Sequence, residues 1–459
     1  MGIASSAQTR TPWVSPLWRL VRQTHSTARA AQVASRMADS GRVNWLACAM
    51  VRTAQCLFDF GAQCMTDPCT DLIHHPYVPP AGFASAAPGV FKASTVLFPS
   101  VAEMHRRDWR DKSGYTYGLH GTPTSFTLEE RLATLEGGRY CTLAPSGLSA
   151  ITLVDMALLA AGDELLVPDN VYGPNRAFAQ VELAKWGITL RVYDAMNPED
   201  LAAQLTPRTR LVWLEAAGSV SMEFPDLPAL LAVVKSANVG RAKPIVTALD
   251  NTWGAGVAFA PFALGVDISM QALTKYPSGG ADVLMGSVIT CDRALHEAIQ
   301  MTHSRLGLGV GANDVELVLR GLPSMHLRYQ RQDATTRALA QWASAQPQFA
   351  AVLHPALPDS PGHAAFVRDA QAAACLFSVV FDARYSRAQV EAFCDHLTLF
   401  GLGYSWAGPM SLVVPYDMPS MRSHRWPHAG VLVRFAIGLE AADDLQADLA
   451  RALAAMDAA

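Results

Sequence analysis

The chain of 459 residues is half hydrophobic and 17% charged, so it can bury a large core and should divide into more than one domain. Its formal net charge of -4 provides no broad basic surface, which argues against nucleic acid or a membrane as partner and favours a small-molecule substrate. The eight scattered cysteines form no CxxC pair, so we expect free thiols in a cytoplasmic protein, and neither a disulfide framework nor a metal site. No apolar run reaches the roughly 18 residues that a membrane-spanning helix needs.

Residues 1–64 differ in composition from the rest of the chain. They contain seven arginines and two acidic residues, Asp39 and Asp59, but no lysine or glutamate. This bias is typical of an organellar transit peptide. The alternative is that translation starts at Met65 and that the upstream residues are not part of the native protein. In either case we expect the segment to be disordered or non-native and to carry no function.

From about Pro88 onward, short apolar runs alternate with stretches of helical spacing. The runs have the length of buried strands and lie at 164–168, 188–194, 210–216, 244–250 and 283–290. The helical stretches between them are 148–160, 174–186 and 226–236. This alternation predicts a mainly parallel sheet with helices on both faces.

A second, smaller α/β unit should follow the first. Two helical stretches lead into it, at 291–302 and 327–345. Its own strands and helices are expected at 375–382, 386–396, 431–438 and 441–456. The chain therefore reads as a large α/β domain followed by a small one.

Two charged residues follow apolar runs of the first unit. Asp250 ends the run 244–250, and Lys275 follows the apolar stretch of DISMQALTKYPSGG. Ligands of open α/β sheets bind at the carboxyl ends of the strands. Burial lowers the pKa of a lysine and makes its amine a nucleophile toward an aldehyde, and a buried carboxylate keeps a pyridinium nitrogen protonated. Each residue alone would more often be a strand-end cap or a solvated charge, but together they indicate a pyridine aldehyde cofactor.

A candidate phosphate site lies in TLAPSGLSAITLVDMALL, where Ser146 and Gly147 begin an expected helix. The N–H groups and the dipole of a helix N-terminus favour a phosphate, and glycine allows a close backbone approach. A Ser-Gly pair at this place is more often a simple N-cap, so the signal is weak alone. Thr274 could add a hydroxyl group, and Tyr172 in NVYGP could cover a ring.

Five longer motifs occur in the chain, in the order YGLHGTPTSFTLEERLATLEGG, LDNTWGAGV, QALTKYPSGGADVLMG, YSWAGPMSL and VRFAIGLE. In this order they closely resemble the Cys/Met-metabolism pyridoxal-phosphate-dependent enzymes, and among these the cystathionine β-lyases, from about residue 66 to the C-terminus. The resemblance implies the aspartate-aminotransferase-like fold (fold type I), with a large, mainly parallel seven-stranded sheet domain and a smaller C-terminal α/β domain. It also implies pyridoxal 5'-phosphate as cofactor and a homotetramer of two active dimers.

The resemblance also assigns residues to the cofactor. Lys275 would be the Schiff-base lysine, and Asp250 would face the pyridine nitrogen. Tyr172 would stack on the ring and assist catalysis. The residues around the phosphate would be Ser146, Gly147, Leu148 and Thr274.

Other residues would bind the substrate. Arg434 would hold the α-carboxylate through a bidentate pair, although a structural pair with Glu440 is the alternative. Ser405 and Trp406 would form the wall beside the lysine that is more typical of the β-lyases than of the γ-lyases and γ-synthases. Tyr117 would reach the cofactor and substrate of the neighbouring subunit.

The chain departs from the family pattern at three places. Leu119 stands where an arginine commonly clamps the phosphate across the dimer, and His120 could replace that arginine in part. Ala272 removes a hydroxyl group near the phosphate, and Met410 replaces a glutamate before the Ser-Leu pair. These changes bear on phosphate affinity and on substrate choice.

The resemblance divides the chain into four parts. Residues 65–125 would form an arm that contributes to the dimer and to the neighbouring active site. Residues 126–325 would form the large cofactor-binding domain, and residues 326–459 the small one. Residues 1–64 would precede them as an extension.

The activity that the resemblance implies is β-elimination of L-cystathionine to homocysteine, pyruvate and ammonia, a step of methionine biosynthesis. Another reaction of the same family is the alternative, as in cystathionine γ-lyase, γ-synthase, methionine γ-lyase or cysteine desulfhydrase. A binding protein that kept the fold would be suggested by loss of the lysine or the aspartate, and both are present. A dehydrogenase of the Rossmann type would need a G-x-G-x-x-G turn after the first strand, which we do not find.

Overall fold

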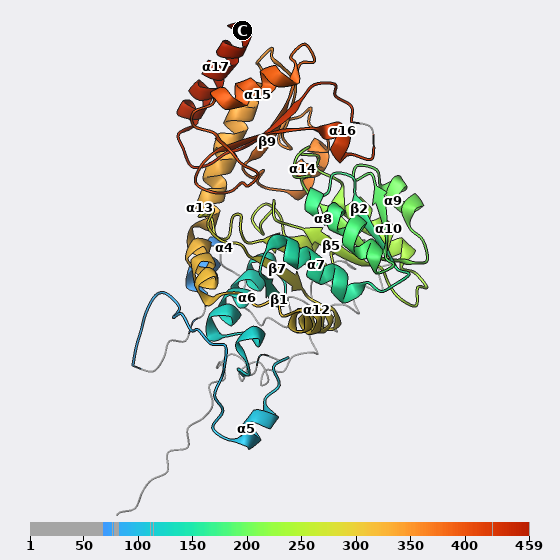
Figure 1. Cartoon of the computed structure of the whole chain (residues 1–459), viewed down its shortest axis with the longest axis vertical. Coiled ribbons are helices and arrows are strands. Elements are labelled where there is room, and N and C mark those ends of the chain that lie inside the picture. The colour runs from blue at the N-terminus through green and yellow to red at the C-terminus, as the bar shows by residue number, and fades with distance from the viewer. Residues whose placement is uncertain are drawn as a thin grey trace, which may run out of the picture.

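The computed structural model describes residues 68–75, 77, 82–110, 112, 114–424 and 426–458. The extension expected at residues 1–64 lies outside the described residues. The described chain begins with helix α4 (Pro68–His74), helix α5 (Val101–Arg106) and the 3₁₀ turn η1 (Gly118–His120). An antiparallel bridge between Thr95 and Tyr117 joins the segments on either side of α5, which lies apart from both sheets in Figure 1.

The first sheet has seven strands and is mainly parallel, as expected. In sheet order these are β1 (Tyr140–Ala144), β7 (Gly286–Thr290), β6 (Ile268–Ala272), β5 (Val246–Asp250), β4 (Thr209–Glu215), β2 (Glu164–Pro168) and β3 (Thr189–Tyr193). Among the described strands of this sheet, only β7 runs antiparallel to its neighbours. The carboxyl ends of β4, β5 and β6 therefore lie at one end of the sheet, where open α/β sheets bind ligands.

Helices cover both faces of this sheet (Figure 1). Apolar residues alternate between the faces: Val212 and Leu214 of β4 pack in one buried cluster, and Leu211 and Trp213 in another. The first face is covered by α6 (Pro123–Glu136), α9 (Pro198–Gln204) and α10 (Leu227–Ala237), and the short helix α11 (Pro261–Leu264) precedes β6. The second face is covered by α7 (Gly147–Leu158), α8 (Gly173–Phe178), the π-helical turn η2 (Ala179–Leu183) and α12 (Arg293–Leu306).

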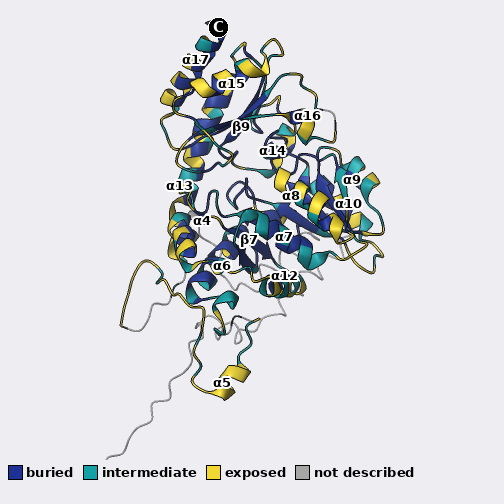
Figure 2. Ribbon diagram, in the orientation of Figure 1, coloured by how far each residue is buried: buried dark blue, intermediate teal, exposed yellow. Residues whose placement is uncertain are grey.

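A smaller unit holds a second, five-stranded sheet with its own hydrophobic core of buried side chains (Figure 2). Its strands, in sheet order, are β10 (Gly401–Leu402), β11 (Leu412–Tyr416), β12 (Leu432–Ala436), β9 (Leu376–Phe381) and β8 (Phe349–Leu353). Its helices are α14 (His363–Asp369), α15 (Arg387–His396), α16 (Met418–Met421) and α17 (Ala442–Ala458). The long helix α13 (Ala312–Ala343) connects the two sheets (Figure 1). The proposed division into residues 65–125, 126–325 and 326–459 places its last boundary within α13 and remains a proposal.

Helix α13 also packs closely on the loop that follows β6. A Cβ atom on Gly321 would lie 2.2 Å from the carbonyl oxygen of Pro277 and 2.6 Å from that of Ser278. Only glycine permits this approach, because any side chain would push the helix away from the loop. The contact holds the segment next to Lys275 against the helix.

The expected elements mostly occur, with differences at three of them. Helix α13 begins at Ala312 instead of residue 327 and includes Pro323, whose missing N–H removes one helical hydrogen bond without ending the helix. The helix expected at 174–186 is a short α-helix followed by η2. The run 283–290 becomes a strand only from Gly286.

The cysteines follow the expectation in part. Cys141, Cys375 and Cys394 are free and buried. Cys291, a half-buried residue directly after β7, is disulfide-bonded, so the expectation of free thiols is wrong at this position. Within the part of the chain that the structure describes, no helix combines the length and the apolar character that a bilayer crossing requires.

Candidate active site

Three neighbouring strands bring candidate residues to one end of the first sheet. Asp250 is the last residue of β5, and Lys275 lies in the turn three residues after β6. Glu215, the last residue of β4, pairs with Asp250 in the β4–β5 register. The structure thus places Asp250 and Lys275 at the same sheet end, with a further carboxylate beside them.

The amine of Lys275 is held by the small unit. Its Nζ donates a hydrogen bond to Ser405 Oγ over 2.8 Å and lies 5.5 Å from the centroid of the Trp406 ring. Both partners belong to the loop between β10 and β11. Burial, followed by the nearby Arg434 guanidinium, lowers the pKa of Lys275 to about 8. About a tenth of this amine is therefore neutral, and so nucleophilic, at pH 7, far more than for a lysine with the ordinary pKa.

Asp250 is oriented by Thr252. The Thr252 backbone N–H and hydroxyl both donate to Asp250 Oδ1, over 3.0 and 2.6 Å. The Thr252 hydroxyl oxygen in turn accepts the N–H of Ala272 on β6, over 2.9 Å. Burial raises the pKa of Asp250, and the nearby Lys275 opposes that rise. Among the described residues no protein group donates to Oδ2, which leaves this oxygen available to a ligand.

The N-terminus of α7 lies against β6. Ser146 is the N-cap, and its hydroxyl accepts the N–H of Ser149 over 3.0 Å. A Cβ atom on Gly147 would lie 2.6 Å from the Cβ of Ala272, so this close packing requires glycine on the helix. The half-buried Leu148 follows Gly147 in the first turn of the helix.

Thr274 lies in the same region, next to Lys275. Its hydroxyl bonds both the carbonyl and the N–H of Met285, over 3.4 and 3.3 Å. Ala272 offers no hydroxyl group here, and Thr274 supplies one on the segment between β6 and Lys275.

Tyr172 lies on the loop between β2 and α8, as its N-cap residue. Its backbone N–H donates to Glu215 Oε2 over 2.7 Å, and its side chain is 41% exposed. Partial burial of the phenol raises the pKa of the Tyr172 hydroxyl, and the carboxylates of Asp250 and Glu215 raise it further. The loop is thus anchored by its backbone, and the phenol ring remains accessible to a ligand.

Arg434, in β12, is a buried arginine with free hydrogen-bonding capacity. It is only 4% exposed, and its two terminal nitrogens donate to the carbonyl oxygens of Ser219 and Tyr404, over 2.9 and 3.0 Å. Its Nε has no partner among the described residues. The carboxylate of Glu440 instead accepts the N–H and hydroxyl of Ser411. The alternative expectation, a structural pair of Arg434 with Glu440, is therefore wrong.

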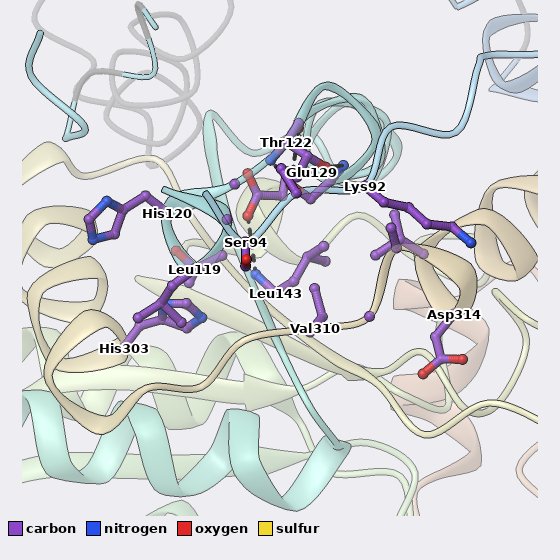
Figure 3. A pocket seen from close by; sticks show the side chains of 18 of the residues that line it. Lys92, Ser94, Leu119, His120, Thr122, Glu129, Leu143, His303, Val310 and Asp314 are labelled. Atoms are coloured by element: carbon purple, nitrogen blue, oxygen red, sulfur yellow. Dashed lines mark hydrogen bonds between the residues drawn. The ribbon is translucent and has the colours of Figure 1, made fainter. Parts of the chain in front are cut away.

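The arm residues lie elsewhere. Tyr117 is 48% exposed, while Leu119 and His120 line a cavity of about 550 Å³ between the arm, α6, α12 and the start of α13 (Figure 3). Lys275, Asp250, Tyr172 and Arg434 are not among the residues that line this cavity, so it is separate from the strand-end site.

His120 has partners within its own chain. Its ring stacks on Trp109 with centroids 4.4 Å apart, and Nδ1 lies 2.9 Å from the hydroxyl of Thr116. Burial lowers the pKa of His120, which favours the neutral imidazole. These contacts weaken the expectation that His120 replaces a phosphate-binding arginine. Met410, the other departure, is exposed.

Two residues at the site were missed from the sequence. Glu215 could have been found as the acid near the end of the strand run 210–216. Arg422 carried no local signal: it donates to Asp169 and Glu223, 253 and 199 residues away along the chain. This cluster joins the segment after α16 to the loops around Tyr172.

Comparisons with known proteins agree with the fold and with these motifs. A protein of Rhizobium johnstonii named putative cystathionine beta-lyase is 39% identical over 81% of this chain and 92% of its own length. Cystathionine beta-lyase of Escherichia coli is 34% identical over 78% of this chain and 91% of its own. A solved structure of cystathionine gamma synthase from Xanthomonas oryzae superposes with a TM-score of 0.76 at 28% identity, covering 86% of this chain and 99% of the other. The model of the Cys/Met metabolism PLP-dependent enzymes matches residues 69–454, and the chain belongs to this family.

Proposed function

We propose that the chain is a pyridoxal-phosphate-dependent carbon-sulfur lyase that cleaves L-cystathionine by β-elimination to homocysteine, pyruvate and ammonia. The family provides the cofactor and an amino acid as substrate. Relatives named cystathionine beta-lyase are 34% to 39% identical to the chain. The observation that carries the proposal is the hydrogen bond from Lys275 Nζ to Ser405 Oγ beside the Trp406 ring, because it fixes an amine of lowered pKa at the end of the cofactor-binding sheet.

The residues at the strand ends fit the pyridine part of the cofactor. Thr252 donates two hydrogen bonds to Oδ1 of Asp250, so Oδ2 is left to accept a hydrogen bond from a protonated ring nitrogen. The amine of Lys275 would bond to the aldehyde carbon as the Schiff-base lysine. Tyr172 would cover the ring, since its loop is anchored and its side chain is accessible.

The phosphate would lie at the N-terminus of α7. Free N–H groups of the first turn and the helix dipole favour an anion at this place. The close packing of Gly147 on Ala272 brings this end of the helix next to the segment that carries Lys275. The residues that would hold the phosphate are Ser146, Gly147, Leu148 and Thr274.

Pyridoxal phosphate, when bound, supplies an electron sink for negative charge at the substrate Cα. The freed amine of Lys275 would remove the Cα proton, because its pKa of about 8 lies close enough to neutral pH for the amine to accept and return a proton. The same amine would return a proton to the departing sulfur, with help from the Tyr172 hydroxyl. Asp250 would keep the ring nitrogen protonated, so that the sink is effective.

Arg434 would bind the substrate α-carboxylate. Its unpartnered Nε and the remaining hydrogens of its terminal nitrogens provide parallel donors that match a carboxylate. Ser405 and Trp406 would form the adjacent wall. Tyr276 packs edge-on against Trp406, with ring centroids 5.8 Å apart, and thereby limits its motion.

We also propose a homotetramer of two active dimers in the cytoplasm. The arm exposes large apolar side chains that a second subunit would cover: Phe83, Val90, Phe91, Leu97, Val101 and Met104. Tyr117 lies on the same arm and is 48% exposed, so it is free to reach the cofactor and substrate of a neighbouring subunit. The free, buried thiols of Cys141, Cys375 and Cys394 suit a reducing compartment, whereas the disulfide of Cys291 does not.

One experiment separates the family activities. The full chain is purified with pyridoxal phosphate, its absorption spectrum is recorded, and the keto acid released from L-cystathionine is identified. We expect an absorption band at the violet edge of the visible and pyruvate as product, with neither in Lys275→Ala. Release of 2-oxobutyrate would mark γ-elimination and would overturn the proposal of a β-lyase. A colourless protein would overturn the assignment of Lys275.

A further inference from the structure

The strand-end site contains a buried carboxylate without a role in the proposed reaction. Glu215 ends β4, is 5% exposed, and sits beside Asp250 in the β4–β5 register. An unpaired carboxylate is costly to bury, so its surroundings must provide donors. These donors are backbone N–H groups of two separate loops, together with the side-chain hydroxyl of Ser219.

Both oxygens of Glu215 hold a loop of the site. Oε2 accepts the backbone N–H of Tyr172 over 2.7 Å, and Oε1 accepts the backbone N–H of Ser219 over 3.0 Å. The first loop carries the ring that would cover the cofactor. In the second loop, the backbone carbonyl oxygen of the same Ser219 accepts a hydrogen bond from Arg434 over 2.9 Å. One carboxyl group therefore links the cofactor-covering loop to the support of the carboxylate-binding arginine.

The charge of Glu215 is compatible with this role. Burial and the neighbouring Asp250 raise the pKa of Glu215 to about 8. The two carboxyl groups therefore carry fewer than two negative charges near neutral pH. Glu215 acts through the oxygen lone pairs that accept the N–H groups of Tyr172 and Ser219, while Asp250 keeps its Oδ2 for the pyridine nitrogen.

We infer that Glu215 is a positioning residue for the lyase reaction: it sets the place of Tyr172 over the cofactor and of Arg434 at the substrate carboxylate, and it touches neither substrate nor cofactor. This inference rests on the proposed function. The inference follows from the two backbone hydrogen bonds, one to each carboxyl oxygen, since a glutamine at this position has one acceptor oxygen. Its amide NH₂ would face the second backbone N–H, donor against donor, and one of the two loops would be released.

The test compares Glu215→Gln with Asp155→Asn. Asp155 is a matched control, because it is fully buried, its pKa is raised to about 7 by burial, and it accepts a hydrogen bond from Trp213 of the same strand β4. Three quantities are measured on the holoenzymes: the melting temperature, the visible circular dichroism of the bound cofactor, and the dissociation constant of L-alanine from its absorbance change. L-Alanine has the α-carboxylate and no leaving group, so binding is read without carbon-sulfur cleavage.

We expect Glu215→Gln to weaken L-alanine binding about tenfold, to change the cofactor circular dichroism, and to raise KM for L-cystathionine more than it lowers kcat. The melting temperature should fall no further than in Asp155→Asn, which should keep wild-type binding and dichroism. Wild-type values of binding and dichroism in Glu215→Gln would overturn the inference. So would a loss of binding that Asp155→Asn shares, because this would be a general effect of removing a buried carboxyl.

A second variant covers the case in which Glu215→Gln does not fold. Glu215→Asp keeps two acceptor oxygens on a side chain one methylene shorter, which can reach only one of the two loops. We expect intermediate weakening of L-alanine binding in it, and binding as tight as in the wild type would overturn the inference. A wild-type protein that binds cofactor and L-alanine but releases no pyruvate would refute the proposed function and leave this test valid.

Discussion

Lys275 donates a hydrogen bond over 2.8 Å to Ser405, a residue 130 positions later in the chain. Lys275 follows β6 of the seven-stranded sheet, and Ser405 lies between β10 and β11 of the five-stranded sheet. The bond therefore crosses from one unit to the other at the proposed reaction centre. A shift of the small unit would change the surroundings of the reactive amine directly.

The rate at which pyridoxal phosphate attaches to the cofactor-free protein should rise with pH and level off above about pH 8. Only the neutral amine attacks an aldehyde, and burial together with Arg434 lowers the pKa of Lys275 from 10.5 to about 8. Below this pKa the amine is protonated and unreactive, so the rate falls as the pH falls. The rate of attachment is measured from the growth of the absorption band after mixing, with Lys275→Ala as the blank. A midpoint near pH 10 would contradict the burial of the amine.

Asp250→Ala should retain cofactor but lose most of its activity, with kcat reduced by roughly 10² or more, about 3 kcal/mol. The reason is that an unprotonated pyridine ring is a poor electron sink. The absorption spectrum gives the bound cofactor, and pyruvate release gives the rate. Thr252→Val should cause a smaller loss of activity, because it removes the hydroxyl that donates to Asp250 and leaves the carboxylate in place. Full activity of Asp250→Ala would mean that another acid holds the ring nitrogen.

Local pattern was sufficient for much of the large sheet. The run at 164–168 coincides with β2, and those at 188–194, 210–216 and 244–250 lie within two residues of β3, β4 and β5 at each end. Each is an apolar run bounded by polar or turn residues, so its limits are set by its own residues. The strands β1, β8, β10 and β11 were not predicted, and in β8 four of the five residues are alanine or only partly buried, which weakens the pattern.

The site was predictable only where chemistry is tied to a motif. Asp250 stands out because it is a charged residue that ends an apolar run, and Lys275 because it lies three residues after another strand. The role of Glu215 depends on strand register: β4 and β5 pair in parallel so that Glu215 lies opposite Asp250, and this register determines which carboxylates are neighbours. Arg422 depends on contacts over about 200 residues or more of sequence, for which a single chain gives no signal.

Arg422→Met should lower the free energy of unfolding by about 3–5 kcal/mol. The Arg422 side chain is 9% exposed and pairs with Asp169 and Glu223, so its loss would leave the mostly buried Glu223 without a cation and Asp169 with only Arg176, 3.7 Å away. Urea unfolding measures the change. The control is Arg368→Met, whose side chain is 49% exposed and whose pairs with Asp226 and Asp369 should be worth no more than about 1 kcal/mol. Equal effects of the two substitutions would show that the Arg422 cluster does not stabilise the contact between the units.

Arg434→Lys should impair binding of the substrate carboxylate while leaving the fold intact. Lysine keeps the charge but lacks the planar fork, so it cannot present two parallel N–H groups to a carboxylate. We expect kcat/KM for L-cystathionine to fall by roughly 10², about 3 kcal/mol, with most of the loss in KM and little change in melting temperature. Within the described residues Arg434 forms no ion pair, so its replacement would leave no structural carboxylate unpaired. We therefore expect the loss to fall on substrate binding and not on stability.

Arg131→Lys is the matched control, since Arg131 is 5% exposed in α6 and Arg434 is 4% exposed in β12. It should change kcat/KM less than twofold, whatever it does to stability. A structural role and a substrate-binding role of Arg434 predict opposite changes in melting temperature and kcat/KM. A large fall in melting temperature together with near-normal kcat/KM would mean that Arg434 serves the fold through Ser219 and Tyr404, and that the substrate carboxylate is bound elsewhere. A kinetic loss at unchanged melting temperature would identify Arg434 as the residue that binds it.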